Sequence, residues 1–97
     1  MGTLYEISRE ELAAIIADGR TVVAELLQTG LFNVDAWLAE VEPLLFDQLD
    51  PPDREELDVC RAHLEGQKVA HLVLDTTFRL LSVLETIETT YEFKAEA

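Results

Sequence analysis

Apolar residues between positions 69 and 91 recur every three or four residues, and this periodicity restricts the fold more than any other feature of the chain. The residues that share this stripe are Val69, Leu72, Val73, Thr76, Leu80, Val83, Leu84, Ile87 and Tyr91. Such spacing places side chains on one face of an α-helix, whereas a half-buried strand would require strict alternation. The pattern therefore predicts a long amphipathic helix over residues 68–91.

A second long helix is predicted in the N-terminal third of the chain. Ser8 and Glu11 form a Ser-x-x-Glu capping box, in which each side chain accepts a hydrogen bond from the other residue's backbone N–H. Gly19 is a weak interruption that costs ~1 kcal/mol relative to alanine, and Gly30 is expected to end the helix in a left-handed conformation. The apolar positions of this helix are Leu12, Ile15, Ile16, Val22, Val23, Leu26 and Leu27.

Two shorter helices are predicted between the long ones. The first begins at Asn33 or Asp35, either of which can cap a helix, and it contains Pro43, which predicts a kink or a restart. The second follows Pro51-Pro52, because proline suits the first turn of a helix. Its apolar stripe consists of Leu57, Cys60 and Leu64. Two alternatives remain at residues 65–67: a turn there separates this helix from the last one, or the two merge into one rod.

These elements predict an all-α fold, a small bundle of three or four antiparallel helices joined by short loops, in a single helical domain spanning residues 1–97. We expect a helix content of ~60% or more, about twice the usual proportion, and no β-sheet. A chain of 97 residues can bury one hydrophobic core but has little room for an enzyme cleft.

Residue patterns that support catalysis or metal binding are not found in the sequence. His63 and His71 lie eight positions apart, roughly 12 Å along a helix, which is too far for one zinc ion. Neither histidine follows a glutamate at the spacing of a di-iron Glu-x-x-His motif. Cys60 belongs to an apolar stripe, where free cysteine usually packs as a small hydrophobe. We therefore expect no enzymatic activity, no metal and no cofactor.

Features that direct a protein to a membrane or to export are also lacking in the sequence. The N-terminal residues have neither the basic nor the apolar region of a signal peptide, and the longest uncharged stretch, residues 26–34, is far too short to cross a bilayer. A single cysteine allows no intrachain disulfide and fits a reducing compartment. These features predict a cytoplasmic protein.

The chain is strongly acidic, because 20 acidic residues face seven basic ones and give a net charge of −13. A surface this negative repels nucleic acid and anionic lipid, both of which require positive charge. It favours a basic protein partner or, alternatively, serves only to keep the protein in solution. Direct binding to nucleic acid or to a membrane is not expected.

The stretch from residue 21 to residue 53 contains seven acidic residues and no basic one, and aromatic residues are interspersed among the acids. Aromatic anchors within an acidic face are typical of a surface that docks on a basic partner. The residues predicted to contact this partner are Trp37, Glu40, Glu42, Phe46, Asp47 and Asp50. The alternative is that the aromatic residues belong to the core and the acids form only a solvated face.

The stripe over residues 69–91 also suggests a role in assembly. Val73, Leu80 and Ile87 repeat every seven residues, as in a coiled-coil seam. The residues offset from them by four are Val69, Thr76, Val83 and Thr90. This pattern predicts a homodimer through residues 69–91.

Two short segments resemble a known family. Residues 3–8, Thr-Leu-Tyr-Glu-Ile-Ser, resemble the opening of the siphovirus gene product one-five-seven family. Residues 84–88, Leu-Glu-Thr-Ile-Glu, followed by Lys94-Ala95-Glu96, resemble that family's next motif, which leads into a long coiled coil. The two motifs lie close together in the family, whereas 75 residues separate them here. The resemblance implies a phage or prophage origin and a link to phage resistance, and it supplies no catalytic residues.

The sequence therefore predicts a non-enzymatic acidic interaction protein, encoded by a phage and acting in the host cytoplasm. It would bind and inhibit a basic or nucleic-acid-binding host protein, in part by mimicking the charge of DNA. The alternative function is that of a structural or assembly module, which homodimerises or docks within a larger complex.

Overall fold

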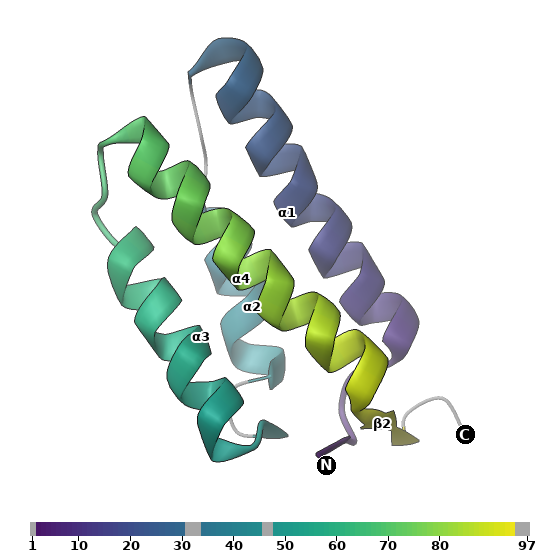
Figure 1. Cartoon of the computed structure of the whole chain (residues 1–97). Coiled ribbons are helices and arrows are strands. Elements are labelled where there is room, and N and C mark those ends of the chain that lie inside the picture. Colours follow the sequence, from purple (N-terminus) through teal and green to yellow (C-terminus); the bar gives the residue numbers. More distant parts are fainter. Residues whose placement is uncertain (1, 31–33, 46–47, 95–97) are drawn as a thin grey trace.

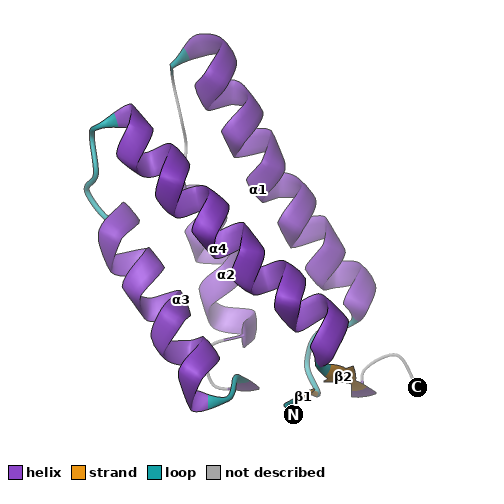
Figure 2. Ribbon diagram, in the orientation of Figure 1, coloured by secondary structure: helices purple, strands orange, loops and turns teal. Residues whose placement is uncertain are grey.

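Helices make up most of the chain that the structure describes, and a short strand pair lies at one end (Figure 2). The computed structural model describes residues 2–30, 34–45 and 48–94, and only the course of the backbone at residues 42–45. Over these ranges the elements are β1 (Thr3–Leu4), α1 (Arg9–Thr29), α2 (Val34–Leu45), α3 (Pro51–Leu64), α4 (Ala70–Thr90) and β2 (Glu92–Phe93). Successive helices run in opposite directions, and α4 packs against both α1 and α3 (Figure 1). The prediction of a small all-α bundle is confirmed.

The start and end of α1 follow from local hydrogen bonds. The Ser8 Oγ accepts from the Glu11 N–H at 3.1 Å, and the Glu11 Oε1 accepts from the Ser8 N–H at 3.3 Å, so the predicted capping box is present. Gly30 ends the helix with a φ of 72° and donates its N–H to the Leu26 carbonyl. The helix continues through Gly19, where a side chain would overlap the Trp37 ring. The glycine therefore permits close packing of α1 against α2 and does not interrupt the helix.

The two shorter helices agree only in part with the sequence analysis. Asp35 lies inside the first turn of α2, and Asn33, the other predicted cap, lies outside the described residues. α2 continues past Pro43 to Leu45, so the predicted restart at the proline is wrong. α3 begins at Pro51-Pro52 as expected, and Leu57, Cys60 and Leu64 are buried. Gly66, with a φ of 72°, lies in a turn between α3 and α4, so these helices do not merge.

α4 is the central helix of the bundle, but its buried face is rotated from the predicted stripe. Its buried residues are Val73, Thr77, Leu80, Leu81, Leu84 and Ile87. Val69 and Leu72, which the stripe included, are 44% and 42% exposed. The predicted dimer seam of Val73, Leu80 and Ile87 is wrong, because all three side chains are buried within the chain's own core.

A short parallel strand pair, which corrects the expectation of no sheet, joins the two ends of the described chain. Thr3 pairs with Glu92 and Leu4 with Phe93. Next to this pair, the Tyr91 hydroxyl donates to the Asp53 carboxylate at 2.6 Å and accepts from the Asp50 N–H at 2.9 Å. Burial and the bond to Asp53 raise the pKa of Tyr91 well above its ordinary value. We call β1, β2, Tyr91 and its two aspartate partners the terminal clasp.

Candidate functional site

Acidic side chains gather along one side of α1. Glu11, Asp18 and Glu25 are exposed and seven residues apart, which is almost two full turns, so all three lie on one flank of the helix. Glu40 of α2 is also exposed, and its carboxyl group meets that of Asp18. We call these four residues the acidic flank.

The contact between Glu40 and Asp18 joins two groups of like charge. Their mutual hydrogen bond requires a proton on one carboxyl, which raises the pKa of Glu40 above its ordinary value. Partial loss of hydration and the Coulomb repulsion from Asp18 raise this pKa further. When both carboxyl groups are ionised they repel each other, and a cationic group from outside the chain could relieve this repulsion.

Close packing between α1 and α2 keeps the two carboxyl groups near each other. The Trp37 indole N–H donates to the Ile15 carbonyl at 2.8 Å, across the interface between the two helices. The same indole ring lies against Gly19, where no Cβ would fit. These contacts fix the backbone of α2 close to that of α1 at Gly19, the residue that follows Asp18.

The arginines of α1 point away from the acidic flank. Arg20 forms an ion pair with Glu85 of α4 at 2.7 Å. Arg9 donates to the Glu88 carbonyl at 3.3 Å, and its guanidinium carbon lies 4.7 Å from the centre of the Phe93 ring. Both cations are therefore directed toward α4 and the C-terminal strand, on the opposite flank of α1.

Three of the residues predicted to contact a partner have described side chains, and these three do not form one surface. Glu40 is exposed and belongs to the acidic flank. Trp37 is only 3% exposed and hydrogen-bonded in the core, so its assignment as a partner-facing anchor is corrected. Asp50 is half-buried at the start of α3 and belongs to the terminal clasp. The side chain of Glu42 and the residues Phe46 and Asp47 lie outside the described residues.

Three members of the acidic flank, Glu11, Asp18 and Glu25, were not among the predicted contact residues. The predicted contact residues come from the stretch without basic residues, which begins after Arg20, and Glu11 and Asp18 both precede it. Glu25 lies within the stretch but away from the aromatic residues. The seven-residue spacing of Glu11, Asp18 and Glu25 is a signal in the sequence that would have identified the flank.

Cys60 is enclosed in the core between α3 and α4. It has no exposed surface, and burial is the main reason that the pKa of its thiol lies above the ordinary value. The nearby ion pair of Glu56 with Arg79 links the two helices over this position. A raised pKa disfavours the thiolate, which is the nucleophilic form of cysteine. Within residues 2–30, 34–45 and 48–94, no group of three or more His, Cys, Asp or Glu side chains could hold a metal ion.

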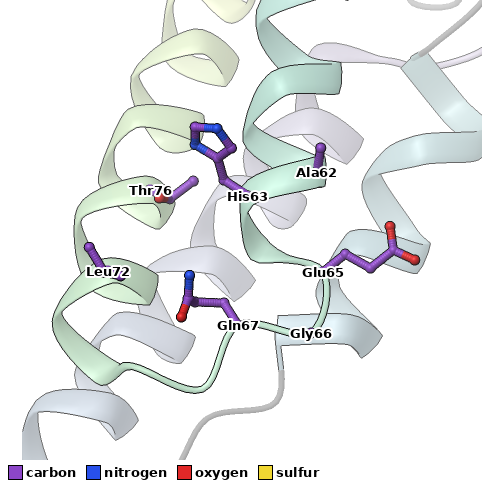
Figure 3. A pocket seen from close by; sticks show the side chains of 7 residues that line it. All are labelled: Ala62, His63, Glu65, Gly66, Gln67, Leu72 and Thr76. Carbon is purple, nitrogen blue, oxygen red and sulfur yellow. The ribbon is translucent and has the colours of Figure 1, made fainter.

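An open groove of about 440 Å³ lies at the turn between α3 and α4 (Figure 3). His63 and Thr76 extend toward one another across it, whereas Glu65 points away. The Gln67 Oε1 accepts from the N–H groups of Lys68 and Val69, both at 3.1 Å, and so stabilises the turn. The Gln67 side chain in this groove therefore serves the connection between the helices.

Comparisons with protein-family models, with curated proteins and with solved structures find no match for the chain. Among the described helices, none has the length and apolar character that crossing a bilayer would require.

Proposed function

We propose that this protein is a non-enzymatic acidic interaction protein that binds a basic, nucleic-acid-binding protein through its acidic flank and inhibits it. The partner's nucleic-acid groove would receive carboxylates in place of phosphates. Such a groove is lined by lysine and arginine side chains, which recognise phosphate chiefly by charge.

The observation that carries this proposal is the contact between Asp18 and Glu40. Two adjacent carboxyl groups repel each other when both are ionised, and a surface needed only for solubility does not require this arrangement. Arg20 is nearby on α1, yet it pairs with Glu85 on the other flank. The acidic flank is thus left free to attract an external cationic group.

The high net charge supports the proposal at longer range. A net charge of −13 on 97 residues produces a negative field that steers a basic protein toward the molecule and raises the rate of association. The two segments that resemble the siphovirus family support a phage or prophage origin, with the partner in the host cytoplasm.

Affinity capture from a bacterial lysate tests this function. The bait is the full chain, and capture is compared at ionic strengths of about 0.05 M and about 0.5 M. We expect basic nucleic-acid-binding proteins to bind at the lower ionic strength and to be released at the higher one. Added duplex DNA should also release them, because it competes for the same groove.

A charge-reversed variant shows whether the acidic flank is the binding surface. The variant carries Asp18→Lys, Glu25→Lys and Glu40→Lys, and the matched control carries Glu55→Lys, Glu65→Lys and Asp75→Lys on α3 and α4 and the turn between them. Each set of three reversals changes the net charge from −13 by six units to −7. Only the acidic-flank variant should lose the captured proteins. Equal loss from the control would show that overall charge, and not this flank, is responsible.

A further inference from the structure

Two large apolar side chains are exposed on the flank of the bundle opposite the acidic flank. Leu27 of α1 is 66% exposed, and Phe78 of α4 is 50% exposed. Leu74, one turn before Phe78, is partly buried and packs against the core. Isolated exposed apolar residues are common on protein surfaces, so their meaning depends on whether they lie together.

The Arg20–Glu85 ion pair shows that Leu27 and Phe78 lie on the same side of the α1–α4 interface. Leu27 follows Arg20 by seven residues, and Phe78 precedes Glu85 by seven residues. Seven residues are almost two turns of helix, so each apolar residue lies above its charged counterpart on the same face. Because α1 and α4 are antiparallel, both steps lead toward the same end of the bundle (Figure 1).

The charges along this side of the α1–α4 interface balance one another. Arg20 pairs with Glu85, and Arg9 lies beside Glu88, to whose carbonyl it donates a hydrogen bond. We call this surface the neutral shoulder, defined by Arg9, Arg20 and Leu27 of α1 and by Phe78, Glu85 and Glu88 of α4. Since the whole chain has a net charge of −13, two copies repel each other less where their neutral shoulders face each other than where their acidic flanks do. A basic partner, in contrast, gains no attraction from a neutral surface.

We propose that the neutral shoulder binds a second copy of this chain. A twofold axis parallel to α1 and α4 places Leu27 of each copy opposite Phe78 of the other. The same axis places Arg20 of each copy beside Glu85 of the other, so the charges are complementary as well as balanced. The interface is isologous, as in most soluble homodimers, and it leaves the acidic flank of both copies exposed. The dimer thus uses α4 residues different from the core residues Val73, Leu80 and Ile87.

Sedimentation equilibrium of the full chain over a range of concentrations tests the dimer. We expect a reversible monomer–dimer equilibrium whose dissociation constant rises roughly tenfold or more in the Leu27→Gln, Phe78→Ser double variant. The control is Tyr5→Ser, which removes a side chain that is 67% exposed but lies outside the shoulder. Circular dichroism of each variant verifies that the helices are retained.

Ionic strength distinguishes this proposal from the proposed function. Screening reduces the repulsion between two anionic copies, so raising the ionic strength from about 0.05 M to about 0.5 M should strengthen the dimer. The same change should release a basic partner from the acidic flank. A chain that remains monomeric at millimolar concentration and high salt overturns the dimer, as does a dimer weakened equally by Tyr5→Ser. Neither result affects the test of the acidic flank.

Discussion

The two flanks of α1 lie on either side of its buried face and differ in electrostatic character. On the flank toward α4, Arg9 and Arg20 meet groups that accept their hydrogen bonds. On the flank toward α2, the carboxyl group of Asp18 meets that of Glu40. One helix therefore has one side on which its cations are paired within the chain and another side on which two like charges meet.

This difference shows that the pattern of buried residues in a small bundle does not determine the charges at its exposed positions. The buried residues of α1 centre on Gly19 and pack against both neighbouring helices, so the core does not require an acidic flank. Exposed flank positions tolerate either sign of charge at little cost in stability, and opposite charges would favour folding. Folding therefore does not explain the like charges on the α2 side, whereas the proposed binding to a basic partner would explain them.

The largest expected effect tests whether the packing of α2 against α1 depends on Trp37. Trp37→Ala removes a buried ring and leaves a cavity, so it should lower the free energy of unfolding by about 3–5 kcal/mol. Chemical denaturation monitored by circular dichroism measures the loss. Leu27→Ala on the other side of α1 is the control, because its side chain is exposed and should change stability by no more than ~0.5 kcal/mol. Similar losses from both variants would contradict the burial of Trp37.

A smaller effect is expected from Gly19, which contacts both neighbours of α1. The added methyl group of Gly19→Ala would overlap the Trp37 ring and the Leu81 side chain. Overpacking of this kind costs about 1–3 kcal/mol, of which the better helix propensity of alanine recovers at most ~1 kcal/mol. Combining Gly19→Ala with Trp37→Phe should cost less than the sum of the two single changes, because the smaller ring makes room. Strict additivity of the two changes in the free energy of unfolding would show that overlap with the Trp37 ring is not the cause of the destabilisation.

The smallest effect concerns the charge on the acidic flank itself. The folded-state pKa of Glu40 is raised, so the folded protein binds a proton more readily than the unfolded chain does. The contribution of Glu40 to the free energy of unfolding is therefore present at low pH. It is lost as the pH rises from 4.5, the ordinary pKa of a glutamate, through the raised pKa of the folded state. Glu40→Gln should remove this part of the pH dependence of the melting temperature. Glu55→Gln, which removes one exposed charge elsewhere, should leave that part in place.

The sequence predicts the helices well because their start and end signals are local. The Ser8–Glu11 box and the left-handed Gly30 involve residues no more than four positions apart. The strand pair was missed because Thr3 and Glu92 meet only after the helices are packed, and two-residue strands have no periodicity of their own.

The candidate site was harder to predict because burial depends on distant contacts. In the sequence, Trp37 resembles a surface anchor. Its buried hydrogen bond to the Ile15 carbonyl, 22 residues away, shows instead that it belongs to the core. The heptad of Val73, Leu80 and Ile87 fits a dimer seam or a monomer core equally well, since spacing alone does not identify the neighbouring helix. Net charge predicted an acidic surface, but the pairing of Asp18 with Glu40 required the structure.

The terminal clasp has a consequence for the order in which the protein folds. Pairing of Thr3 with Glu92 closes a loop that contains all four helices of the described chain, so the loss of chain entropy is large until those helices have docked. The clasp is therefore the last part to form and the first to open. Hydrogen exchange should show this at the Glu92 amide, which donates to the Gly2 carbonyl at 3.1 Å and exchanges through local opening. The amides in the middle of α4 should exchange only when the whole bundle unfolds.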